Sequence, residues 1–159
     1  MDAIEMLTKQ HRELETSLKA ALAAEGNDRR RLFEGCADVL MSHVLVEEQH
    51  FYPEVKAKRT EDILLESLEE HLSLKRLMAD LEDLSVSDEH FEPKLHVLSE
   101  QAKHHHEEEE EKLFPKVKKL LSAAELLELG NTMGAAQALL LANEPRKLAA
   151  TQKKKAADV

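Results

Sequence analysis

The sequence has no tryptophan, one tyrosine, and only four glycines and four prolines among its 159 residues. So few aromatic residues disfavour a β-sheet protein, and so little glycine and proline permits long, regular helices. The single cysteine, Cys36, excludes an intramolecular disulfide and fits a reducing compartment. We therefore expect one helical domain, since this length supports a single substantial core.

Basic residues are also scarce relative to acidic ones, at 22 against 32, which gives a formal net charge of −10. An acidic chain is repelled by phosphate backbones, so nucleic acid is a poor partner. No apolar run approaches the roughly 18 residues of a membrane span. The N-terminal segment is charged from its second residue and does not resemble a signal peptide. These features predict a cytoplasmic protein that does not enter the membrane.

Apolar residues recur at three- and four-residue steps through most of the chain, which predicts amphipathic helices. We expect an all-α, antiparallel, up-down-up-down four-helix bundle with a short fifth C-terminal helix. Asp2 should cap the first helix, and Pro53 and Pro115 should kink the second and fourth. The bundle should cover residues 1–143, including a last helix over 122–143, and residues 144–159 should form a flexible basic tail. The expected long helices span about 2–25, 28–59, 61–84 and 88–121.

An internal repeat links the second and fourth of these helices. His43 precedes Glu47, Glu48 and the sequence FYP, and His105 precedes Glu109, Glu110 and the sequence LFP at the same offsets. The two motifs are 62 residues apart. Two lone histidines, His11 and His71, interrupt the apolar stripes of the first and third helices and are 60 residues apart. The chain thus consists of two copies of one helix–helix unit.

The repeat predicts a metal centre, because it places six polar side chains in the core. Histidine and glutamate four residues apart share one helix face, here the apolar one. Four buried imidazoles and two buried carboxylates would be strongly destabilising without a partner. Two metal ions satisfy them if each takes two histidines and the glutamates bridge. The expected metal ligands are His11, His43, Glu47, His71, His105 and Glu109.

Carboxylate and imidazole ligands suit two iron ions joined by an oxo or hydroxo bridge, with manganese or zinc as substitutes. About five donors for each ion would leave one open position. The alternative is a metal-free bundle in which the segment HHHEEEEE, residues 104–111, is a solvated charge run. We assign most of that run to solvent: His104 and His106 should point away from the centre, and Glu110 should be exposed.

This pattern of residues resembles the hemerythrin-like, or HHE cation-binding, family over about residues 1–142. The resemblance implies a four-helix bundle around a bridged di-iron centre. Oxygen-storing hemerythrins have a fifth histidine one turn from the third-helix ligand, where this chain has Lys75. The site is therefore similar to the symmetric, six-ligand bacterial type, and simple oxygen transport is not implied.

The function favoured is reversible binding or sensing of dioxygen, nitric oxide or peroxide. Enzymatic turnover of peroxide or nitric oxide, with a redox partner, is an alternative, as is iron handling or repair. We assign no catalytic residue, and the chain could act as a monomer or a homodimer. Tyr52 and Cys36 are expected to pack in the core, and His50 to lie half exposed at the end of the bundle.

Overall fold

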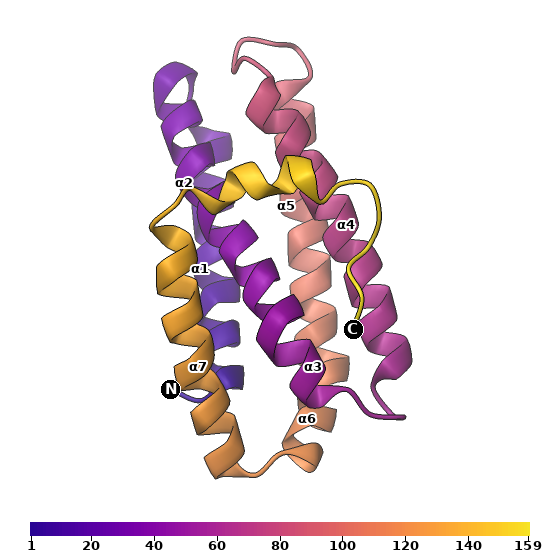
Figure 1. Cartoon of the computed structure of the whole chain (residues 1–159). Helices are drawn as coiled ribbons and strands as arrows, with labels where there is room; N and C mark the ends of the chain where they lie inside the picture. The colour runs from indigo at the N-terminus through magenta and orange to yellow at the C-terminus, as the bar shows by residue number, and fades with distance from the viewer.

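The computed structural model describes residues 1–159, and helices are its only regular secondary structure. Four antiparallel helical columns run up, down, up and down, and a further helix lies along the outside (Figure 1). The predicted all-α four-helix bundle is confirmed. No helix is long and apolar enough to cross a membrane. In chain order the elements are α1 (Ala3–Ala23), α2 (Gly26–Val46), the π-helix η1 (Glu47–Phe51), α3 (Tyr52–Val55), α4 (Glu61–Asp83), α5 (Phe91–Glu108), the π-helix η2 (Glu109–Leu113), α6 (Phe114–Leu120), α7 (Ala123–Leu141) and the 3-10 helix η3 (Pro145–Thr151).

Two capping boxes are present, one of them at Asp2, the cap expected from the sequence. Asp2 accepts a hydrogen bond from the Glu5 backbone, and the Glu5 side chain accepts one from the Asp2 backbone. Ser122 and Glu125 form the same pair at the start of α7. These bonds satisfy N–H groups that have no partner inside the helix. Capping therefore fixes where the first and last long helices begin.

The ends of the middle helices differ from the prediction. The second column stops at Val55 rather than near Arg59, because Lys56 is extended and the Thr60 hydroxyl donates to the Val55 carbonyl. Gly26, which lies between the first two expected helices, begins α2 with a φ of +56°, a conformation that glycine adopts without strain. The fourth column begins at Phe91, later than expected, after a turn over residues 85–90.

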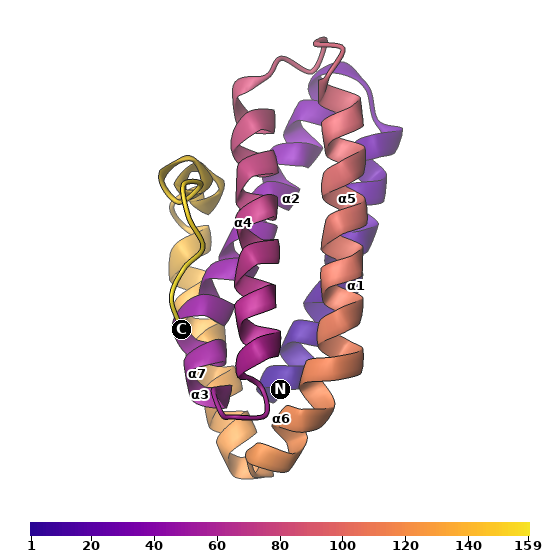
Figure 2. The same ribbon diagram turned by 90° about the vertical axis from the view of Figure 1, so that its right-hand side faces the viewer.

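The apolar core is divided into two clusters along the bundle. One contains Leu14, Leu40 and Leu74, and the other contains Leu7 and Leu68. The lone histidines fall between these leucines in the sequence, so a polar layer separates the two clusters. Figure 2 shows the columns of α4 and α5 in front of those of α1 and α2, all running along the long axis of the bundle. The fold therefore brings one short stretch of each column to the same height.

The C-terminal part of the chain packs outside the bundle. Helix α7 lies against α1 and α2, and η3 crosses α2 and α4 (Figure 1). Arg146 anchors η3, because its buried guanidinium makes ion pairs with Glu34, Asp38 and Glu82. The residues after η3 follow α4, where Arg76 donates to the Lys153 carbonyl. The flexibility expected of residues 144–159 stays a prediction, but this segment has defined contacts.

Helix α7 packs closely against the backbone of the N-terminal residues at Gly130. A Cβ atom on Gly130 would lie 2.5 Å from the Met1 carbonyl oxygen and 2.8 Å from the Ala3 nitrogen, whereas one on Gly134 would meet nothing within 4 Å. Gly130→Ala should therefore destabilise the protein by about 1–3 kcal/mol through overpacking. Gly134→Ala is the matched control and should stabilise it by up to about 1 kcal/mol through helix propensity. Urea unfolding measures both; equal stability of the two variants would mean that the N-terminus does not pack on α7.

Candidate metal centre

The six predicted ligands converge in the polar layer between the two apolar clusters. Each column contributes: α1, α2 and α4 each place one histidine there, α5 places another, and the π-helices η1 and η2 place the two glutamates. All six side chains are at most 1% exposed. They are His11, His43, Glu47, His71, His105 and Glu109. The helix register inferred from the repeat is therefore correct for every one of them.

Each carboxylate stands between a histidine of one half of the site and a histidine of the other. Glu47 Oε1 lies 3.2 Å from His43 Nε2 and 3.4 Å from His71 Nε2. Glu109 Oε1 lies 3.3 Å from His11 Nε2 and 3.5 Å from His105 Nε2. The donor atoms of His11, His43 and both glutamates lie within 4.8 Å of one another, as do those of Glu47, His71 and His105. Both carboxylates are thus placed to be shared between two cations.

The outer nitrogen of each histidine donates to an oxygen outside the centre. His11 Nδ1 donates to Glu110 at 2.7 Å, and His71 Nδ1 donates to Glu48 at 2.8 Å. His43 Nδ1 and His105 Nδ1 donate to the side-chain oxygens of Gln10 and Glu70, at 2.8 and 2.9 Å. An imidazole protonated at Nδ1 presents the lone pair of Nε2, so all four lone pairs face inward. Outer partners of this kind orient the histidine ligands of metal ions.

The inward atoms have no adequate partner within the protein. His11 Nε2, His43 Nε2, both oxygens of Glu47 and Glu109 Oε1 are buried without a hydrogen bond. His71 Nε2 and His105 Nε2 are 3.0 Å apart, a distance at which the two nitrogens can share one proton or bind one cation. Unpartnered buried groups of this kind are costly. The donor set therefore fits bound metal, and four imidazoles with two carboxylates suit iron, manganese or zinc.

Burial and mutual repulsion shape the ionisation of these groups. Burial, followed by the nearby Glu109 carboxylate, raises the pKa of Glu47 well above its ordinary value. Burial alone would raise the pKa of Glu109 too, but His105 and His11 hold it well below the usual range. Burial and the adjacent His11 lower the pKa of His43, which keeps this imidazole neutral. The centre thus holds a neutral imidazole ready to bind a cation, and a carboxyl that must lose a proton to do so.

Two π-helical turns position the glutamates. At Pro53 and Pro115, where kinks are predicted, the helix widens by one residue immediately before each proline. Proline has no N–H, so the carbonyl four residues earlier lacks its usual partner. The preceding N–H groups, of Tyr52 and Phe114, bond to the carbonyls of Glu47 and Glu109 five residues back. The prolines thus favour π-helical turns in the two segments that begin with Glu47 and Glu109, the expected ligands. Such turns are frequent at functional sites.

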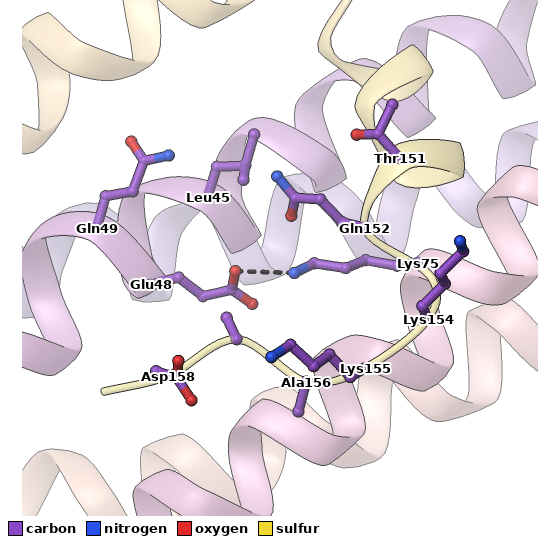
Figure 3. A pocket seen from close by; sticks show the side chains of 11 residues that line it. Leu45, Glu48, Gln49, Lys75, Thr151, Gln152, Lys154, Lys155, Ala156 and Asp158 are labelled. Carbon is purple, nitrogen blue, oxygen red and sulfur yellow. Dashed lines mark hydrogen bonds and ion pairs between the residues drawn. The ribbon is translucent and has the colours of Figure 1, made fainter.

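A buried ion pair supports one of the outer partners. The Lys75 ammonium lies 2.8 Å from Glu48 Oε1, while the other oxygen of Glu48 accepts from His71. Burial alone would raise the pKa of Glu48, but His71 and Lys75 lower it and keep the carboxylate charged. Figure 3 shows this pair at the floor of a pocket whose outer wall is the C-terminal segment, including Gln152 and Asp158. Lys75 thus fixes the position of the Glu48 carboxylate, which in turn orients His71.

The outer partners follow the repeat, although the sequence analysis did not identify their bonds. Glu48 and Glu110 are equivalent positions, and each binds the lone histidine of another column. Gln10 and Glu70 immediately precede the two lone histidines, and each binds the histidine of a His-x3-Glu motif. The expectation that Glu110 is exposed was wrong, because it is only partly exposed and also pairs with Arg12. The sequence did contain a signal for Gln10 and Glu70, because they are 60 residues apart, as are the lone histidines that follow them.

Helix α7 secures Gln10. The Gln137 amide donates to the Gln10 oxygen at 3.1 Å and to the Ser42 hydroxyl at 3.0 Å. In return, the Gln10 amide donates to the Gln137 oxygen at 2.6 Å. The Gln10 oxygen that receives the His43 proton is therefore fixed from two sides. This contact explains how a helix outside the bundle can influence the centre.

Tyr52 has a role beyond packing. It is fully buried, as expected, but its hydroxyl donates to Glu109 Oε2 at 2.9 Å and lies 3.2 Å from His71 Nε2. Burial, followed by the carboxylates of Glu109 and Glu47, raises its pKa well above the ordinary value, so the phenol stays protonated. Its repeat counterpart is Phe114, and this one-atom difference was the signal in the sequence. The two halves of the centre are therefore not identical.

His106 was also missed. The expectation that it points away from the centre was wrong, because its side chain is 1% exposed and stacks on His11 with ring centroids 4.0 Å apart. The repeat held a signal here too, since the counterpart of His106 is Val44, which is buried. His104 is exposed as expected. The charge run therefore contributes two inward histidines rather than one.

The remaining candidates lie away from the six residues. His50 is partly exposed, as expected, and lines a surface pocket with Glu54 and Glu128. Cys36 is buried in an apolar cluster, and burial raises the pKa of its thiol to about 12. A thiol in that state is unreactive. The packing role expected for Cys36 is consistent with this environment.

The chain was compared with known proteins. The family model described as "Hemerythrin HHE cation binding domain" matches residues 2–117. A crystal structure of a hemerythrin HHE cation binding domain-containing protein from Mycobacterium kansasii has a TM-score of 0.79. It is 23% identical to this chain, and the match covers 97% of this chain and 95% of that one, which shows the shared fold. No curated protein matches the sequence significantly. The match over residues 2–117 establishes that the chain belongs to the hemerythrin HHE cation-binding family.

Proposed function

We propose that this is a cytoplasmic, non-haem di-iron protein that reversibly binds a small ligand, either dioxygen, nitric oxide or peroxide. One ion is held by His11 and His43, the other by His71 and His105, and both share the carboxylates of Glu47 and Glu109. The observation that carries the proposal is the set of inward nitrogen and carboxylate oxygen atoms of His11, His43, Glu47 and Glu109 that have no hydrogen-bond partner. Two cations would complete this set, because one oxygen of each carboxylate already lies between two histidines.

The burial of the centre supports a small ligand. The larger surface pockets reach Glu48, Lys75, Glu70 and His50, but none is lined by any of the six proposed ligands. A substrate larger than a few atoms would have to open the bundle. Iron held by imidazoles and carboxylates with open positions supplies the chemistry of oxygen-reacting non-haem proteins. The protein's own contribution is to orient the imidazoles, share two carboxylates and exclude bulk water.

Turnover of peroxide is the second candidate, and the Tyr52 hydroxyl favours it. A protonated phenol beside Glu109 and His71 is a proton donor within the dry centre. Cleavage of peroxide to water requires protons, whereas reversible binding of dioxygen or nitric oxide does not. Sustained reduction would also require an electron donor, and we propose a separate redox partner for that case.

Matched glutamate variants separate ligands from outer partners. Glu109→Ala and Glu47→Ala each remove a shared carboxylate and one negative charge, so iron content should fall and the iron absorption bands should disappear. Glu110→Ala and Glu48→Ala each remove the acceptor of one histidine but no metal ligand, so the centre should survive with metal affinity weakened by about 10–100-fold. Glu48→Ala also leaves the buried Lys75 unpaired, so it should lower stability more than Glu110→Ala does. Iron analysis and absorption spectra measure both effects. Loss of the centre in Glu110→Ala but not in Glu109→Ala would contradict the assigned ligands.

Ligand binding is tested on the iron-loaded protein. The reduced protein, prepared without oxygen, should change its absorption spectrum on exposure to dioxygen or nitric oxide, and the change should reverse when the gas is removed. Disappearance of many equivalents of peroxide per chain, slowed in Tyr52→Phe, would instead favour the enzyme. If none of the three ligands alters the spectrum of a protein with two irons, the proposed function is wrong.

A further inference from the structure

A fifth imidazole is buried against the centre on one side only. The ring of His106 is parallel to that of His11, with an interplanar angle of 9° and centroids 4.0 Å apart. It meets the ring of His43 edge-on at 5.3 Å. Its side chain comes from α5, one residue after His105, yet faces the opposite half of the centre. Three histidines thus gather around the proposed position of one ion.

His106 differs from the other four histidines in its hydrogen bonding. Both of its ring nitrogens are buried, and neither has a partner in the protein. A neutral imidazole has one N–H donor and one acceptor, and leaving such groups unpaired costs about 1–3 kcal/mol each. An isosteric apolar residue would avoid that cost, and the repeat counterpart Val44 is indeed apolar. The burial of His106 therefore calls for a bonding partner that the protein does not supply.

The neighbouring donor atoms indicate what that partner is. His11, His43 and His106 each offer a nitrogen within 4.8 Å of the other two. His11 and His43 also belong to the group that contains Glu47 and Glu109. No group of the protein bonds to either nitrogen of His106. A metal ion beside His11 and His43 would accept the lone pair of one of them.

We infer that His106 is a third imidazole ligand of the ion held by His11 and His43. This inference rests on the proposed two-metal centre and extends it. The ion beside His71 and His105 has no fifth histidine, because Val44 occupies the equivalent place, and it has the Tyr52 hydroxyl nearby instead. The two ions therefore differ in their ligands, which replaces the symmetric six-ligand site expected from the sequence.

The asymmetry bears on where a small ligand would bind. With His106 as a third imidazole, the ion beside His11 and His43 would keep fewer open positions than the ion beside His71 and His105. Dioxygen, nitric oxide or peroxide would then be bound on the side of His71 and His105. The Tyr52 hydroxyl lies on that same side, 3.2 Å from His71 Nε2. The protein thus places its proton donor next to the more open ion.

Titration of the metal-free protein with cobalt(II), followed by its visible absorption, tests the inference. His106→Phe retains a ring that can stack on His11 but removes both nitrogens. Wild type should bind two ions, and His106→Phe should bind one of them about tenfold or more weakly, since even outer partners contribute 10–100-fold. His104→Phe, at the exposed neighbouring position, is the matched control and should titrate like wild type. The metal-free His106→Phe protein should melt no lower than wild type, because no bonded polar group is lost.

A measurement on the unaltered protein covers the case in which His106→Phe does not fold. In zinc-loaded protein labelled with ¹⁵N-histidine, NMR should show five metal-bound imidazoles. Four bound imidazoles with two zinc ions, or a His106→Phe titration equal to that of His104→Phe, would overturn the role of His106 and leave the two-metal centre intact. A wild type that binds fewer than two ions would overturn the two-metal centre. The role of His106 would then also fail unless His106→Phe weakened the remaining ion.

Discussion

The structure depends on the cost of burying ionisable groups in the middle of the bundle. Four imidazoles and two carboxylates occupy a layer between two apolar clusters, where water does not compensate them. In a bundle of this size, several kcal/mol per unpaired buried charge is comparable with the whole stability of the fold. The layer is therefore tolerable only if cations occupy it. This requirement links the fold to the function more directly than any feature of the surface.

The outer shell determines that these groups face metal rather than one another. Each of the four histidines donates its Nδ1 proton outward, which fixes both the tautomer and the ring orientation. The supports themselves are held in place: Glu48 by Lys75, Glu110 by Arg12, and Gln10 by Gln137 of α7. The π-turns before the two prolines complete the arrangement by positioning the glutamates. These contacts fix the orientation of all four imidazoles, which favours metal binding.

Much of this could be predicted from the sequence, because helix periodicity and an internal repeat both report on which face is buried. The bundle and the convergence of the six side chains follow from those two signals, and the cap at Asp2 follows from its residue type. The helix ends near Val55 and Phe91 could not, because they depend on local bonds such as that of the Thr60 hydroxyl. The π-turns were expected as kinks, since a missing proline N–H does not specify how the helix accommodates it.

The features missed in the centre are the departures from the repeat. A symmetric interpretation treats Tyr52 as another Phe114 and overlooks that His106 replaces a buried valine. Both differences place polar atoms in the core, but on opposite halves of the centre: Tyr52 beside His71, and His106 beside His11. A repeat identifies what two halves share, so the residues that distinguish the halves emerge only when the packing is known.

The most direct test of the central claim is the melting temperature of the protein with and without its metal, measured together with metal content. The account predicts about two irons in each chain as purified. Because tight binding adds several kcal/mol of stability, their removal by a chelator should lower the melting temperature by roughly ten degrees, and added iron should restore it. An unchanged melting temperature, or a single zinc ion in each chain, would contradict the claim that the buried layer exists to hold two iron ions.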